Sequence, residues 1–132
     1  MKKTVSAIAL ALLFTGQAHA ACKQKDAKGT WITYQAAFLA AGPHVGQCKL
    51  VVDKDGNVSE ADGSYCEFVT FNTPQFPTDG TFKVNKDCSV DINLSVGSLI
   101  GQVQMTKDKQ LYAGRFSAQG GTVSGTTTGV KQ

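Results

Sequence analysis

The amino-acid sequence predicts an all-β protein, an antiparallel up-and-down barrel of about eight strands held by two disulfides. Apolar and polar residues alternate with a period of two along nearly the whole chain after residue 20. Short turn signals separate these segments, which favours pairing between neighbouring strands. The four cysteines form an even set. Closing the strands into a barrel removes exposed edges and leaves an interior for side chains or one small ligand.

Residues 1–20 have the pattern of a secretory signal peptide. Met1-Lys2-Lys3 is a positively charged start, residues 5–14 are an apolar run, and Ala18-His19-Ala20 supplies the small residues that the peptidase needs. The apolar run has about ten residues, half of the roughly twenty that a membrane-spanning helix requires. We therefore expect residues 21–132 to be exported as one domain, to the periplasm or the extracellular space, with no membrane insertion after removal of the signal peptide.

The expected strands follow one another closely along the chain. They are residues 30–37, 48–52, 65–71, 81–85, 89–96, 101–105, 111–116 and 122–130. The clearest is 89–96, in which polar and apolar residues alternate without a break, so that one face meets a core and the other meets water. Residues 35–41 are left open as either a short helix or the end of the first strand. A longer loop with Pro74 and Pro77 is expected over residues 72–80.

Turn chemistry and charge argue against several classes of function. Asp53-Lys54-Asp55-Gly56-Asn57 is a hairpin turn signal, and its spacing departs from that of a calcium loop. Of the 13 basic residues, Lys2 and Lys3 lie in the leader, and the 13 − 2 = 11 that remain nearly match the 10 acidic ones, which argues against a nucleic-acid binder. His44, expected in a solvated loop beside Pro43, is the one histidine after the leader, so a serine hydrolase triad lacks its base. We expect no enzyme, no metal site and no cofactor.

A family resemblance starts at the first strand. Gly29-Thr30-Trp31 resembles the Gly-x-Trp motif of the calycin group, which includes lipocalins, avidins and bacterial metalloprotease inhibitors. The resemblance implies a calycin-like barrel with Trp31 packed at its closed end, in lipocalins under a basic residue of the last strand. The only arginine, Arg115, falls in the expected next-to-last strand. Gly46-Gln47-Cys48-Lys49-Leu50, followed by Cys66, is similar to the disulfide-bearing second and third strands of the inhibitors.

A second resemblance concerns residues 80–88. This stretch, Gly-Thr-Phe-Lys-Val-Asn-Lys-Asp-Cys, is similar to one found in small exported bacterial β-proteins of unknown function. It implies the same kind of fold and carries no implication about activity.

The cysteines all follow the leader and allow three connectivities. Their spacings include no Cys-x-x-Cys pair, which argues against zinc. Cys48 and Cys66 lie on sequential expected strands, while Cys22 precedes the first strand and Cys88 lies in a turn at that rim, so we predict Cys48–Cys66 and Cys22–Cys88. The position of Cys22 also leaves a lipoprotein as a weaker alternative, against which His19-Ala20-Ala21 lacks the aliphatic residue of a lipobox.

Aromatic residues gather near one expected mouth of the barrel. Phe68, Phe71 and Phe76 surround the proline-containing loop, and Phe38 lies near the connection at the same end. They are candidates for contact with a ligand or a partner. The alternative, weighted more heavily for so small a domain, is that they fill the barrel.

Two functions remain. The first is an exported, non-catalytic binding protein that holds a small apolar ligand, with Val103 or Leu94 as wall residues. The alternative is a periplasmic protein-interaction module, such as a protease inhibitor, acting through loops or through residues 21–28. A small apolar ligand or an exported protein is the expected partner in either case.

Overall fold

The computed structural model describes residues 21–39, 42–68 and 74–132, and the chain there is all-β. The strands are β1 (Gly29–Leu39), β2 (Gly42–Val52), β3 (Asn57–Val58), β4 (Tyr65–Phe68), β5 (Phe76–Pro77), β6 (Gly80–Val84), β7 (Ser89–Leu94), β8 (Leu99–Met105), β9 (Leu111–Ala118) and β10 (Val123–Lys131). Short 3-10 turns are η1 (Gln24–Ala27), η2 (Glu60–Asp62), η4 (Val96–Ser98) and η5 (Gln119–Gly121). No helix in these ranges is long and apolar enough to span a membrane.

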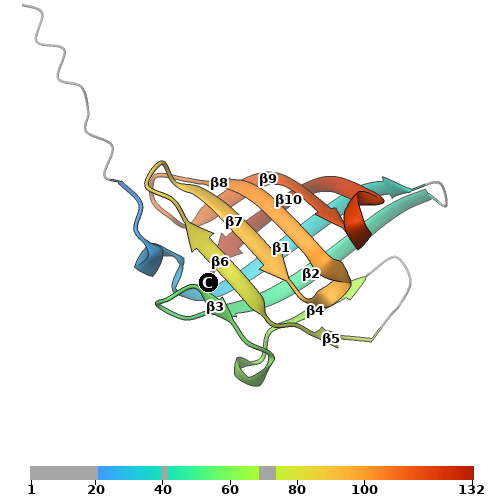
Figure 1. Cartoon of the computed structure of the whole chain (residues 1–132), viewed down its shortest axis with the longest axis horizontal. Helices are drawn as coiled ribbons and strands as arrows, with labels where there is room; N and C mark the ends of the chain where they lie inside the picture. The colour runs from blue at the N-terminus through green and yellow to red at the C-terminus, as the bar shows by residue number, and fades with distance from the viewer. Residues whose placement is uncertain (1–20, 40–41, 69–73) are drawn as a thin grey trace, which may run out of the picture.

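The strands close into an eight-stranded antiparallel barrel, as predicted (Figure 1). Neighbours pair in the order β1-β10-β9-β8-β7-β6-β3-β2, and a further pairing of β1 with β2 closes the ring. Strand β2 is long enough to pair with β3 at its C-terminal end and with β4 along its middle, and β5 pairs with β4. This closed barrel is consistent with the calycin-like architecture that the Gly-x-Trp motif implied.

The strands bury the faces that the alternation of apolar and polar residues predicted. Along β8 the odd-numbered residues from Leu99 to Met105 are buried and the even-numbered ones are exposed. Strand β7 alternates as well: Val90, Ile92 and Leu94 are buried, and the residues between them are half-buried or exposed. A half-polar strand of this kind buries one face in the barrel and leaves the other in water.

Near the mouth, the structure resolves one alternative that was left open and corrects the predicted start of the second strand and the predicted loop 72–80. Residues 35–39 continue β1 as a strand, and β2 begins at Gly42 rather than at residue 48. The reason is that the two strands pair along their whole length, down to Leu39 opposite Gly42. The predicted strand 65–71 is β4, described to Phe68, and residues 69–71 lie outside the described ranges. The expected loop 72–80 contains the two-residue strand β5.

The two ends of the barrel differ in what fills them. The β2–β3, β6–β7 and β8–β9 turns lie at the end we call the closed end, together with η1 and the C-terminus (Figure 1). The β7–β8 and β9–β10 connections lie at the opposite end, which we call the mouth, together with the paired ends of β1 and β2 at Leu39 and Gly42. The closed end belongs to the core, and the mouth carries the candidate site.

The closed end is packed around Trp31, which is fully buried. Its ring lies 5.4 Å from those of Phe82 and Tyr112. Its indole Nε1 donates a hydrogen bond of 2.7 Å to the carbonyl of Ala27, at the end of η1. Lys131, in the last strand, lies with Nζ 5.7 Å from the centre of the Trp31 ring. The basic residue that the calycin resemblance implied is therefore a lysine of β10, and not Arg115.

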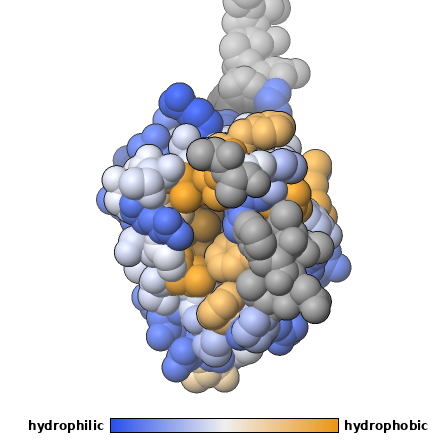
Figure 2. All heavy atoms as spheres, turned by 90° about the vertical axis from the view of Figure 1, so that its right-hand side faces the viewer, coloured by the Kyte–Doolittle hydropathy of each residue, from blue (hydrophilic) through white to orange (hydrophobic). Residues whose placement is uncertain are grey.

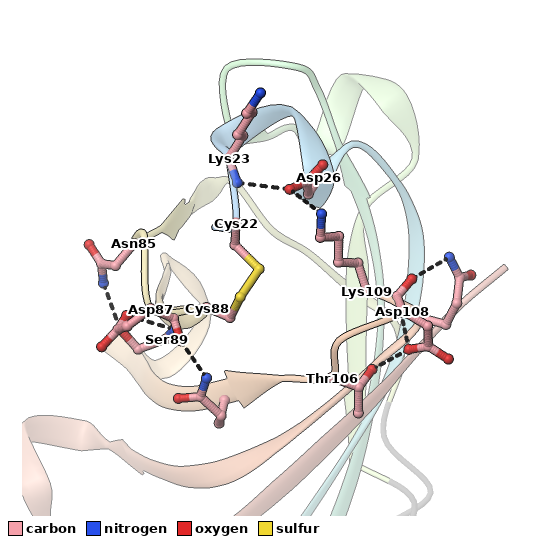
Figure 3. The surroundings of a disulfide bond; sticks show 12 residues. Cys22, Lys23, Asp26, Asn85, Asp87, Cys88, Ser89, Thr106, Asp108 and Lys109 are labelled. Carbon is pink, nitrogen blue, oxygen red and sulfur yellow. Dashed lines mark hydrogen bonds and ion pairs between the residues drawn. A yellow bond between two sulfur atoms is a disulfide. The ribbon is translucent and has the colours of Figure 1, made fainter. Parts of the chain in front are cut away.

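Segment η1 packs on this end of the barrel through the buried Ala27, and Figure 3 shows it beside the Cys22–Cys88 disulfide. The side chain of Gln24 donates to the carbonyl of Phe82 and accepts from the N–H of Val84. It therefore satisfies backbone groups of β6 as a neighbouring strand would. The Cys22–Cys88 disulfide, which we predicted, ties the segment to the β6–β7 turn. Asp26 forms an ion pair of 3.1 Å with Lys109. The N-terminal segment is thereby part of the folded domain.

Candidate functional site

A cavity of about 230 Å³ opens at the mouth of the barrel. Its lining comes from eight elements around the ring and is mostly apolar: Gln35, Leu39, His44, Cys48, Cys66, Phe68, Val96, Gly97, Leu99, Phe116, Ala118, Gln119 and Val123. Figure 2 looks onto this end of the molecule and shows a hollow with hydrophobic residues at its centre. The described lining residues include no lysine, arginine, aspartate or glutamate.

The cavity exists because side-chain volume falls along the barrel axis. The interior of the closed end is occupied by Trp31, Phe82 and Tyr112, which pack against one another. Toward the mouth the buried or half-buried positions include small residues such as Ala37 and Ala118. Side chains of this size do not reach the axis of an eight-stranded barrel, so the space there stays unfilled by the described chain.

One wall is fixed by the second disulfide. Cys48 of β2 and Cys66 of β4 face each other in the register of the two strands, with their Cα atoms 4.0 Å apart. Both are buried and both line the cavity. The prediction of this pairing is confirmed, and the bridge holds β4 against β2 where β3 no longer pairs with it.

Below the cavity lies a layer of buried polar side chains. Gln35 donates from Nε2 to Oγ1 of Thr33 over 2.7 Å. The hydroxyl of Tyr112 shares hydrogen bonds with Thr33 and Thr127. Burial raises the pKa of Tyr112 well above its ordinary range, and these two hydrogen bonds offset only part of that rise. The layer is therefore neutral at physiological pH, and it joins the cavity floor to the closed end.

The four candidate phenylalanines do not share one position relative to the cavity. Phe68 lines the cavity, and Phe76 packs behind it with ring centres 5.7 Å apart. Phe38 is 88% exposed and does not line the cavity. The sequence alternation in β1 indicates this orientation. Every second residue from Trp31 to Ala37 faces inward, so Phe38, which follows Ala37, faces outward. Phe71 lies outside the described residues.

The sequence suggested that His44 and Pro43 lie in a loop, and this prediction is wrong. Both residues belong to β2. The extension of β2 opposite β1 brings His44 into the cavity wall, half-buried. Its ring centre is 5.0 Å from that of Phe68. An imidazole is thus a polar group in an otherwise aromatic part of the wall.

The sequence did not identify most residues of the cavity lining, and the two wall residues that it suggested lie deeper in the barrel than the cavity. Leu94 and Val103 are buried core residues and do not line the cavity. Leu99 and Phe116, which do, face inward in the same alternating pattern. Alternation identifies the inward face of each strand but not the depth of a residue along the barrel.

The predicted turn at Asp53 uses its carboxylate within the turn. Its Oδ1 accepts hydrogen bonds of 2.8 Å from the N–H groups of Asp55 and Asn57, and Oδ2 accepts from the side chain of Asn57. These bonds, that of the Asn57 side chain above all, lower the pKa of Asp53. Gly56 has φ of +87° there, a conformation that glycine adopts without strain.

In the described ranges no three histidine, cysteine, aspartate or glutamate side chains gather as a metal site would require.

No protein-family model matches the chain, and no curated protein matches it. The function is therefore argued from the barrel and its cavity.

Proposed function

We propose that this protein is an exported, non-catalytic binding protein that holds a small apolar ligand in the cavity at the mouth of its barrel. The observation that carries the proposal is the contrast between a filled closed end and an apolar cavity of about 230 Å³ at the other end. Concave, mostly apolar sites with a few polar groups are typical of small-molecule binding.

The cavity volume limits the size of the ligand. An engineered apolar cavity of about 150 Å³ binds benzene, so in proportion this cavity suits a molecule of about nine non-hydrogen atoms. A larger ligand would have to protrude from the mouth. A lining without lysine, arginine, aspartate or glutamate favours a neutral ligand, because a buried ion without a partner would lose its hydration uncompensated.

Two features support a site of action outside the cytoplasm. The first is the leader pattern of residues 1–20, with its charged start, short apolar run and Ala-x-Ala end. The second is the pair of disulfides, which persist in oxidising compartments and are rare in the cytosol. We therefore place the working protein in the periplasm or the extracellular space.

The alternative function, a protease inhibitor acting through residues 21–28, has less support. Cys22 and Ala27 are buried, and the disulfide and the Gln24 hydrogen bonds hold the segment on its own barrel. Entry of this segment into the cleft of another protein would require breaking those contacts. An interaction through surface loops has no comparable observation in its favour.

The experiment compares two neighbours on β8. Leu99 lines the cavity and is 8% exposed, whereas Ile100 points outward and is 48% exposed. Calorimetric titration with n-octanol is expected to show binding to the unmodified protein and to Ile100→Lys. We expect at least a tenfold loss for Leu99→Lys, because its buried ammonium would face the ligand.

A second variant guards against simple misfolding of Leu99→Lys. Val123→Phe adds an apolar side chain to the cavity lining, so it should weaken n-octanol binding by occupying space rather than by adding charge. No binding of n-octanol to the unmodified protein, or an equal loss in Ile100→Lys, would refute the proposed site.

A further inference from the structure

We propose that the ligand carries a hydrogen-bond donor, a hydroxyl or an amide N–H, which it presents to the side-chain carbonyl of Gln35 at the cavity floor. This inference rests on the proposed function and specifies its ligand as a neutral amphiphile rather than a hydrocarbon, an ether or a carboxylate. Gln35 is 6% exposed and borders the cavity.

The amide of Gln35 is half satisfied by the protein. Its Nε2 donates to Thr33 Oγ1 over 2.7 Å. Its Oε1 lies 3.8 Å from Sγ of Cys48, but that sulfur is bonded to Cys66 and carries no hydrogen to donate. Within the described part of the chain, this buried carbonyl therefore receives no N–H or O–H hydrogen bond.

A buried carbonyl without a donor is unfavourable, and a ligand that supplies the donor recovers that loss on binding. The backbone opposite supports the same approach. A Cβ at Gly46 would lie 3.1 Å from Oε1 of Gln35, so the absence of a side chain there keeps the oxygen uncrowded. The floor thus offers one acceptor inside an apolar wall.

The surroundings also limit the charge of the group that binds there. The described lining residues include no lysine or arginine that could pair with a carboxylate and no aspartate or glutamate that could pair with an ammonium. His44 is the one side chain among them with an imidazole, and its ring packs against that of Phe68. The phenol of Tyr112 beneath the floor stays neutral because burial raises its pKa. A neutral donor is the group that satisfies Gln35 without leaving a buried charge.

The experiment uses two pairs of isomers that differ in the presence of a donor. The pairs are n-octanol with heptyl methyl ether, and phenethyl alcohol with benzyl methyl ether. For each pair the ratio of ether to alcohol dissociation constants is measured by calorimetry, in the unmodified protein and in Gln35→Leu. We expect the ratio to fall roughly three- to tenfold in Gln35→Leu, the range of one hydrogen bond.

Leu99→Ala is the matched control, because it enlarges the same cavity without touching the amide. It should weaken or strengthen alcohol and ether together and leave their ratio unchanged. A ratio that is equal in the unmodified protein and in Gln35→Leu would overturn this inference while leaving the proposed function standing. Absence of binding by all four compounds would instead overturn the proposed function.

A measurement on the unmodified protein keeps the test decisive if Gln35→Leu does not fold. The side-chain amide resonances of Gln35 should shift on addition of n-octanol and shift far less with heptyl methyl ether. Equal shifts with both isomers, or a larger shift with the ether, would contradict a donor contact at Oε1.

Discussion

The two ends of the barrel have one disulfide each but use it for different purposes. At the closed end, Cys22–Cys88 fastens η1 over an aromatic layer, and Lys131 packs on Trp31. At the mouth, Cys48–Cys66 stiffens the wall of a cavity that the chain leaves unfilled. The difference suggests that stability is concentrated at one end, which leaves the other end free to bind a ligand.

The largest expected effect comes from emptying the closed end. Trp31→Ala removes two ring contacts and the hydrogen bond to Ala27, and it should lower the free energy of unfolding by about 4 to 5 kcal/mol. The control is Phe38→Ala at the mouth, which should change it by less than about 0.5 kcal/mol because Phe38 is exposed. Denaturant unfolding followed by circular dichroism measures both. Similar losses in the two variants would remove the contrast between the ends.

The two disulfides should differ in both size and kind of effect. They close chain segments of 66 and 18 residues, so the chain-entropy model assigns about 4 kcal/mol to Cys22–Cys88 and about 3 kcal/mol to Cys48–Cys66. Replacing each pair by alanines and measuring unfolding in denaturant tests this order. Only the Cys48/Cys66 replacement should also weaken n-octanol binding, because it alone alters the cavity wall. The reverse order of stability, or loss of binding in the Cys22/Cys88 variant alone, would argue against this division.

A smaller effect is expected from the acidic group that anchors η1. Burial acts to raise the pKa of Asp26, but the N–H of Lys23 and the ammonium of Lys109 outweigh it and hold the pKa below 3.8. A carboxyl with a lowered pKa in the folded state adds stability above its unfolded pKa and loses it as the pH falls through the folded value. Asp26→Asn should therefore cost up to about 1 kcal/mol at neutral pH.

The pH dependence separates this effect from a general loss of packing. The difference between the unmodified protein and Asp26→Asn should shrink as the pH falls below 3.8 through the folded pKa. Asp55→Asn, in an exposed ion pair with Lys54, serves as the control and should change stability little at any pH. A difference that stays constant down to the lowest pH would show that the carboxylate charge is not the cause.

Much of this fold was predictable from the sequence, because the alternation of apolar and polar residues shows which side of each strand faces the barrel interior. It located the inward residues of β7 and β8, and the order of the strands along the chain led to both disulfides. The role of Lys131 was missed for a local reason. The last strand was expected to end at residue 130, and the only basic residue considered beside Trp31 was Arg115.

The cavity was less predictable, because it depends on how deep each inward residue lies along the barrel axis and on how much space its side chain fills. That Phe38 faces away from the cavity was predictable, since its position in the alternation that starts at Trp31 places it on the outer face of β1. The position of Leu99 near the mouth and of Val103 deeper in the core depends on the tilt and stagger of the strands, which a single sequence does not specify. The state of Gln35 depends on a sulfur brought beside it from another strand.

The central claim is that a ligand enters at the mouth and leaves the closed end unchanged. A titration of isotope-labelled protein with n-octanol, followed by two-dimensional NMR, tests it most directly. We predict shifts of the Gln35, Leu99 and Phe116 resonances, with the indole N–H of Trp31 unmoved. Shifts centred on Trp31 and η1, or none anywhere at saturating n-octanol, would contradict the account.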